Sequence, residues 1–84
     1  MKLVTFQKFV CYEKKYECLH KPGVERLVAI NADQVVKVLP RKSSGNKDIV
    51  YSCTYYCEVI TTNGGCEKVE GDLFEVIEKL SSSL

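Results

Sequence analysis

The chain has 84 residues, of which 45% are hydrophobic, so it has room for one small folded domain and is too apolar to be intrinsically disordered. Its formal net charge of +1 gives no overall field that would draw it to nucleic acid or to an anionic membrane. No apolar run approaches the roughly 20 residues of a membrane-spanning helix, so we expect no contact with a membrane. The single domain is expected over residues 1–80, with a frayed tail over 81–84.

Residues 2–12 form the first predicted strand. Apolar side chains alternate along it, but both faces carry some of them, which indicates partial burial on both sides or a bulge near Lys8. Residues 13–21 leave two interpretations open. They fit either the tip and returning arm of a hairpin or the spacing of one helical face, and the hairpin is preferred.

Two shorter strands are predicted over residues 24–30 and 34–39, where apolar and polar side chains alternate. Residues 31–33 between them are Asn-Ala-Asp, whose short polar side chains bond to nearby backbone N–H groups and favour a turn. Pro40 is expected to end the second strand, because proline cannot donate to a central ladder. The polar residues 41–48 that follow predict a loop.

The longest alternation in the chain begins at Ile49 and continues to Thr62. Its period of two, kept for about a dozen residues, predicts one long and half-buried strand. Cys53 and Cys57 both fall on its apolar face, where free cysteine commonly serves as a small hydrophobic side chain. We therefore expect both thiols in the core.

The last third of the chain predicts a hairpin and a helix. Asn63-Gly64-Gly65 favours a hairpin turn, because Asn and Gly tolerate the backbone angles that suit the twist of the flanking strands, and residues 66–70 return as a short strand. Asp72 can cap a helix with an apolar stripe at i, i+3, i+4 and i+7. The stripe consists of Leu73, Val76, Ile77 and Leu80. A helix this short is marginal in water, so it is expected to dock on the sheet.

Together these elements predict an α+β fold that is mainly β: an antiparallel sheet of about five strands with one short C-terminal helix packed on it. A chain this small has difficulty covering both faces of such a sheet. Val50, Tyr56 and Ile60 are apolar side chains on the otherwise polar face of the long strand. Because such residues indicate a second layer or a partner, we predict a protein interface there, most simply with a second copy in a dimer.

The five cysteines do not predict a disulfide scaffold. Their number is odd, and the N-terminus lacks the long apolar core of a signal peptide, so we expect a cytoplasmic protein with reduced thiols. No CxxC pair is present, and the one weak metal-site candidate combines Cys11, Cys18, His20 and Cys66. We expect no metal, no cofactor and no enzymatic activity, since a single histidine could meet a cysteine only by chance of folding.

Charge is distributed unevenly between the two halves of the chain. Residues 1–42 carry nine basic and four acidic side chains, or +5, whereas residues 43–84 carry three and seven, or −4. The halves are expected to neutralise one another across the fold or across a dimer. The alternative is a basic face that binds nucleic acid. Its residues would be Lys14, Lys15, Lys21, Arg26, Lys37, Arg41 and Lys42.

Two segments carry a resemblance to a known family: LVAINADQVVKV, from Leu27, and EVITTNGGCEKVEGDLFEVIEKL, which ends at Leu80. Together they resemble the FlbD-type short proteins of bacteria and phages, which are linked to flagellar regulation. The second segment is also similar to the closing hairpin and helix of LytTR-type DNA-binding domains. The resemblance implies the order of strands and turns, and it assigns no functional residue. We expect a small non-enzymatic regulatory or interaction protein that binds itself or an unidentified protein, with nucleic-acid binding as the alternative.

Overall fold

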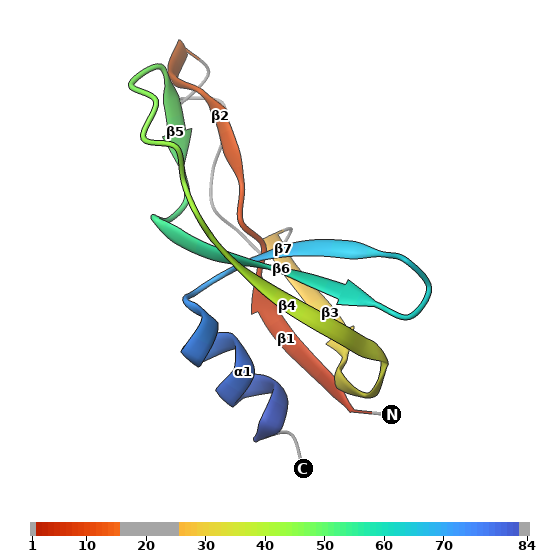
Figure 1. Ribbon diagram of the computed structural model, residues 1–84. Coiled ribbons are helices and arrows are strands. Elements are labelled where there is room, and N and C mark those ends of the chain that lie inside the picture. Colours follow the sequence, from red (N-terminus) through yellow and green to blue (C-terminus); the bar gives the residue numbers. More distant parts are fainter. Residues whose placement is uncertain (1, 16–25, 83–84) are drawn as a thin grey trace.

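The computed structural model describes residues 2–15 and 26–82. Its elements in chain order are β1 (Leu3–Gln7), β2 (Cys11–Glu13), β3 (Leu27–Asn31), the 3-10 turn η3 (Ala32–Gln34), β4 (Val35–Lys42), β5 (Ile49–Tyr51), β6 (Tyr55–Thr61), β7 (Cys66–Glu70) and the helix α1 (Leu73–Ser81). The predicted class, α+β and mainly β with one short C-terminal helix, is confirmed (Figure 1).

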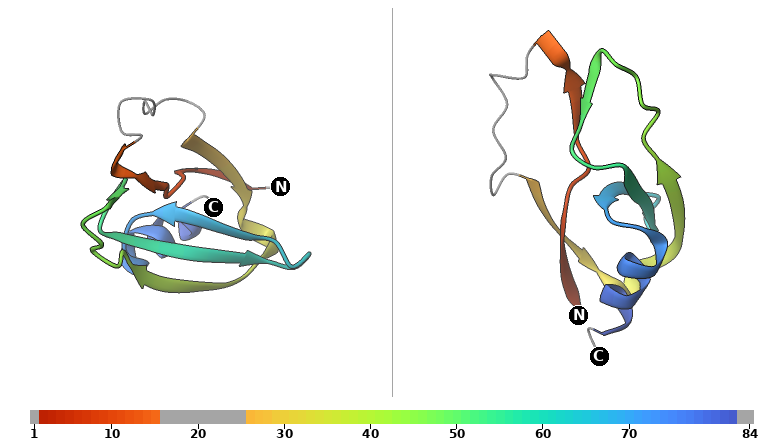
Figure 2. Two further views of the ribbon diagram at one scale, coloured as in Figure 1. Left: turned by 90° about the horizontal axis from the view of Figure 1, so that it is seen from above. Right: turned by 90° about the vertical axis from the view of Figure 1, so that its left-hand side faces the viewer.

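The described strands form three small antiparallel sheets instead of one sheet of about five strands. β1 pairs with β3, β2 pairs with β5, and the third sheet has the order β4-β6-β7. The β2–β5 pair extends from the body as an arm, and α1 lies at the opposite end of the molecule (Figures 1 and 2). The molecule is elongated as a result, with extents of 41 × 23 × 22 Å.

Both long predicted strands are broken where the chain passes from the body into the arm. The first breaks at Lys8, where the bulge was expected, and Lys8 pairs with Val69 of β7. The second breaks between β5 and β6. There the Ser52 N–H donates to the Val10 carbonyl at 2.9 Å, and the Ser52 hydroxyl accepts from the Val10 N–H at 3.0 Å. The two breaks therefore stabilise one another, although the alternation of side chains continues through both.

Pro40 lies inside β4, so the prediction that it ends the strand is wrong. β4 is an edge strand among the described elements. The Ser43 N–H donates to the Thr54 carbonyl at 2.8 Å, and alternate residues back along β4 bond to β6 in the same way. Pro40 occupies one of the intervening positions, where an N–H would point away from the sheet and none is needed. The strand therefore includes the first two residues of the loop predicted over 41–48.

The core lies between the β1–β3 pair on one side and the three-stranded sheet on the other, and α1 contributes to it from one end (Figure 2). The buried hydrophobic residues of the described chain are Val4, Phe6, Ile30, Cys57, Val59, Val69 and Val76. Cys57 is thus a core residue, as expected. Cys53 is only half-buried, so the same prediction is wrong for Cys53, because the break between β5 and β6 carries it out of the face that the core covers.

The predicted turns and cap are confirmed. The Asn31 side chain accepts a hydrogen bond from the Asp33 N–H at 3.1 Å and so starts η3. Gly64 takes a positive φ of 85° in the turn between β6 and β7. The Asp72 side chain accepts from the Glu75 N–H at 2.9 Å and caps α1. Each of these features is determined by residues close together in the sequence.

The helix continues one residue further than predicted, to Ser81, and Ser82 caps its C-terminal end. The hairpin arm or helix predicted over 13–21 is described only at residues 13–15, and residues 16–25, which include the start of the strand predicted over 24–30, lie outside the described part of the chain. No helix in the described ranges is both long enough and apolar enough to cross a membrane.

Candidate functional site

The helix α1 presents apolar side chains on two sides. Leu73, Val76 and Leu80 pack against the core, and Val76 is fully buried. Phe74, by contrast, is 85% exposed, which makes it the most exposed of the large apolar side chains in the described chain. Ile77 was predicted to dock with the first group, but it is 46% exposed.

Phe74 and Ile77 belong to one continuous strip of the helix surface. Because an α-helix turns by about 100° per residue, residues 74, 77 and 81 lie within one narrow arc. That arc is offset from the side that packs on β4 and β6. We call Phe74, Ile77 and Ser81 the outer stripe. Phe74 was not among the predicted surface residues, although a large apolar residue outside the docking stripe of an otherwise amphipathic helix was a signal for it.

The three residues of the predicted interface do not form one surface. Tyr56 and Ile60 lie on the outer face of the three-stranded sheet, whereas Val50 belongs to β5 in the arm. The Phe9 ring stacks on Tyr56, with the ring centroids 3.9 Å apart and the planes 12° from parallel. All three predicted residues are half-buried. The second layer expected over Tyr56 is therefore supplied by the chain itself.

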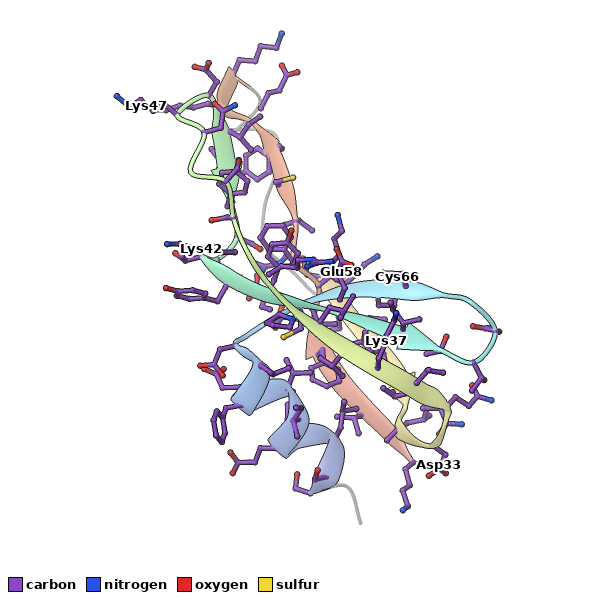
Figure 3. The ribbon with its side chains drawn as sticks, viewed as in Figure 1. Asp33, Lys37, Lys42, Lys47, Glu58 and Cys66 are labelled. Atoms are coloured by element: carbon purple, nitrogen blue, oxygen red, sulfur yellow. The ribbon has the colours of Figure 1, made fainter. Side chains whose placement is uncertain are left out.

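The predicted basic residues do not share one face either. Lys14 and Lys15 follow β2 in the arm, with Lys47 also at its far end (Figure 3). Three further residues lie on β4, in the body of the molecule. These are Lys37, Arg41 and Lys42. Lys21 lies outside the described residues.

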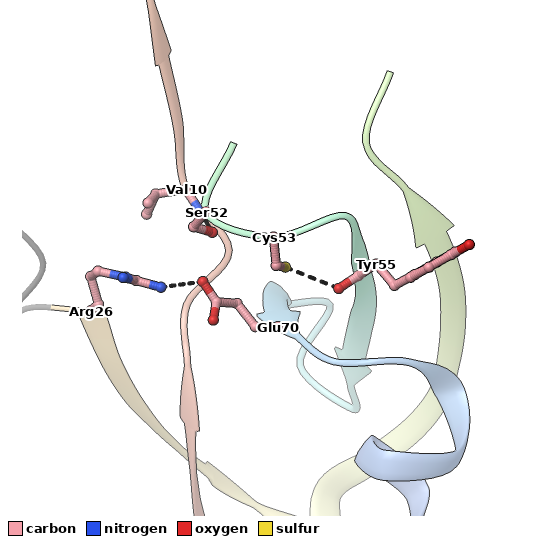
Figure 4. A network of polar contacts seen from close by, with 6 residues as sticks. All are labelled: Val10, Arg26, Ser52, Cys53, Tyr55 and Glu70. Atoms are coloured by element: carbon pink, nitrogen blue, oxygen red, sulfur yellow. Dashed lines mark hydrogen bonds and ion pairs between the residues drawn. The ribbon is translucent and has the colours of Figure 1, made fainter. Parts of the chain in front are cut away.

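Both candidate arginines are paired with carboxylates. Arg26 donates to Glu70, and both side chains are only about a fifth exposed (Figure 4). Arg41 lies 3.3 Å from Glu58 on the outer face of the sheet. Both pairs join the basic first half of the chain to its acidic second half. They reduce the positive charge that is free to meet a phosphate.

The Cys53 and Cys57 thiols are poorly suited to chemistry. Cys53 donates to the Tyr55 carbonyl at 3.0 Å (Figure 4), and burial, helped by the nearby Glu70 carboxylate, raises its pKa above the ordinary value. Burial also raises the pKa of Cys57, and the Asp72 carboxylate adds to the effect. Because the thiolate is the reactive form, both groups are weak nucleophiles at neutral pH.

The weak metal-site candidate is not assembled by the described residues. Cys11 is exposed on the arm, and Cys66 is exposed at the hairpin end of β7. Cys18 and His20 lie outside the described chain. Within residues 2–15 and 26–82, no three metal-ligating side chains come together.

An open cleft of about 480 Å³ lies beside the first turn of α1. Cys53, Asp72 and Glu75 line it together with parts of β1 and β6. At its other end the Lys79 ammonium bonds to the Thr5 carbonyl and lies 4.7 Å from the centroid of the Phe6 ring. The acidic Asp72 is occupied in capping the helix, and the thiol is protonated. The cleft is therefore the seam between α1 and β1, without a nucleophile and base arranged for catalysis among its described lining.

The open edge of β4 is protected against pairing with another strand. Pro40 removes one outward N–H group, Lys37 and Lys42 add charge, and the register with β6 shifts at a bulge after Val35. These are the devices by which natural sheets prevent edge-to-edge association. This edge is consequently a poor docking site.

The outer face of the β1–β3 pair is also a poor docking site, although Leu3 is 59% exposed there. Register places Leu3 opposite Asn31, Ala29 opposite Thr5, and Leu27 opposite Gln7. Each apolar side chain on this face therefore has a polar neighbour across the strands.

Comparison with family models, curated proteins and solved structures gave no match for the chain. The resemblance to FlbD-type proteins stays a prediction, and function is inferred from the surfaces of the chain itself.

Proposed function

We propose that this protein is a small, non-enzymatic interaction protein that associates with a second copy of itself. The observation that carries the proposal is the exposure of Phe74 on the outer stripe of α1. A large aromatic side chain held in water on a rigid helix costs hydration free energy that a partner removes. Aromatic side chains are enriched at the buried centres of protein–protein contacts relative to the rest of the protein surface.

The absence of enzymatic activity is part of the same proposal. It is supported by the raised pKa values of Cys53 and Cys57 and by the commitment of Arg26 to Glu70. The resemblance of residues 27–80 to FlbD-type proteins of bacteria and phages supports a regulatory role in the bacterial cytoplasm. A regulatory protein of this size acts by binding, and self-association is a common way to enlarge its surface.

Sedimentation velocity of the full chain tests self-association. The weight-average sedimentation coefficient is expected to rise between low micromolar and near-millimolar protein, and to approach the value for two chains. Reducing agent is kept in every sample, so that disulfides through the exposed Cys11 and Cys66 cannot imitate the effect. A coefficient that stays at the value for one chain over the whole range would contradict the proposal.

A further inference from the structure

The outer stripe of α1 is graded in size from one end to the other. Phe74, at its N-terminal end, is large, Ile77 is intermediate, and Ser81, at its C-terminal end, is small. Residues 74 and 81 are seven positions apart, or about 10 Å at 1.5 Å per residue. The midpoint lies between Ile77 and Glu78. When two such stripes run in opposite directions, the large end of each lies beside the small end of the other, so their shapes are complementary.

We infer that two copies of the chain dock through their outer stripes, with the two α1 helices antiparallel about a two-fold axis. This inference rests on the proposed function. Phe74 of each copy then lies beside Ser81 of the other, where the small side chain leaves room for the ring, and the two Ile77 side chains meet near the axis. Such a contact uses the same patch on both partners, so it closes as a dimer and does not extend into a filament.

The electrostatics of the helix ends agree with this direction. The first turn carries the positive end of the helix dipole and the last turn the negative end. An antiparallel pair brings the unlike ends together, whereas a parallel pair would bring the like ends together. Glu78 follows Ile77 at the edge of the stripe, close to the axis. In the dimer the Glu78 carboxylates of the two chains therefore approach one another, and their repulsion opposes association.

The size of the stripe sets the strength of the contact. Two exposed phenylalanines and two half-exposed isoleucines, with their surroundings, cover on the order of several hundred Å², which is below the roughly 1,200 Å² of a stable standard interface. Together with the repulsion between the two copies of Glu78, this area makes the dimer weak and readily reversible. Phe74 supplies most of the apolar area, so it is the side chain on which affinity depends most.

The first test compares Phe74→Glu with Leu3→Glu in the full chain by sedimentation velocity. Both substitutions place a carboxylate at an exposed apolar position, at 85% and 59% exposure, and neither touches the core. We expect Phe74→Glu to weaken the dimer about tenfold or more and Leu3→Glu to change it by about twofold at most. Thermal melting monitored by circular dichroism checks that both variants remain folded.

The second test uses charge at the axis. Glu78→Lys is mixed with the wild-type chain, and the fractions of the three dimers are read by native mass spectrometry. Opposite charges then meet only in the mixed dimer, so it is expected to exceed the one-half share that random pairing gives. Random pairing, or an unchanged affinity of Phe74→Glu, would overturn the helix interface while leaving self-association intact. A wild-type chain that stays monomeric would overturn the proposed function as well.

Discussion

At the scale of single residues, Cys57 shows why a cysteine suits this core. Its side chain is fully buried among the β6, β7 and α1 residues, and its thiol donates weakly to the Gly71 carbonyl at 3.6 Å. Gly71 itself has a φ of 120°, and the Cβ of any other residue there would lie 3.2 Å from the Glu75 carboxylate. The chain thus turns tightly from β7 into the helix, directly beside a small apolar group that leaves room for the turn.

We predict that Cys57→Ala lowers the free energy of unfolding by about 1 kcal/mol at neutral pH, and by less in alkaline solution. Burial raises the pKa of the folded thiol above its ordinary value of 9.0, so the folded protein holds this proton more tightly than the unfolded chain. The contribution of the buried, protonated thiol to the free energy of unfolding is therefore complete at pH values below the ordinary thiol pKa. It is lost as pH rises through the folded pKa. Alanine has no proton to lose and escapes this loss.

Urea unfolding of both proteins at pH values below and above the ordinary thiol pKa measures the effect. Other groups titrate in alkaline solution as well, but they are common to both proteins and cancel in the difference. The difference in unfolding free energy between wild type and variant is expected to shrink as pH rises. A difference that is constant or grows would show that the folded thiol is not held protonated by its burial.

At the scale of secondary-structure elements, helix caps and turns could be predicted from the sequence, whereas the partner of each strand could not. The cap at Asp72, the glycine turn at Gly64 and the side-chain bond of Asn31 all depend on residues within three positions of one another. The division of the two long strands depends on which distant strand each half meets. Since an alternation of period two is the same in either sheet, the pattern of side chains cannot show where β5 ends and β6 begins.

The surface of α1 was only half predictable for a related reason. The helical period identified the apolar stripe, but it predicted that all four of its residues, Ile77 included, are covered by a broad sheet. The helix instead packs on a narrow surface formed by β4 and β6, which covers Leu73, Val76 and Leu80 and leaves Ile77 at the margin. The outer stripe thus arises from the small size of the sheet, which no pattern within the helix can reveal.

We predict that Val76→Asp unfolds the protein, whereas Ile77→Asp leaves it folded. Val76 is 1% exposed, so a carboxylate there has neither water nor a hydrogen-bond partner and is expected to cost about 3 kcal/mol or more, a large part of the stability of a domain this small. Ile77 is nearly half-exposed, and its replacement is expected to cost about 1 kcal/mol or less. Thermal unfolding by circular dichroism compares the two variants, and equal destabilisation would contradict the docking of α1 through Val76.

At the scale of the whole molecule, opposite charges are paired across the fold, and the most exposed large apolar side chain of the described residues, Phe74, lies on α1. The pairs of Arg26 with Glu70 and of Arg41 with Glu58 join the two halves of the chain, as the charge distribution predicted. The lysines of the predicted basic face that the structure describes are divided between the tip of the arm and β4, so they form no single track for a phosphate backbone. The outer stripe lies on the helix at the opposite end from the arm (Figure 1).

The response to salt is expected to separate the proposed function from nucleic-acid binding. A contact through Phe74 and Ile77 buries apolar area and brings two copies of Glu78 together, so added sodium chloride screens the repulsion and leaves the dimer as tight or slightly tighter. A complex with nucleic acid loses affinity steeply with salt, because bound cations are released from the phosphates. Sedimentation velocity of the protein alone, and fluorescence anisotropy with a labelled oligonucleotide, are measured over the same salt series.

A dimer that persists in high salt, beside an oligonucleotide that does not bind, would support association through the outer stripe. Tight oligonucleotide binding with a steep salt slope would instead favour the basic residues, and Lys14→Ala with Lys15→Ala would identify the arm as the binding element if it reduced that slope. Dissociation of the dimer by salt would contradict an apolar contact, since burial of hydrocarbon is not weakened by mobile ions. The salt series thus decides between the helix end and the arm end of the molecule as its binding surface.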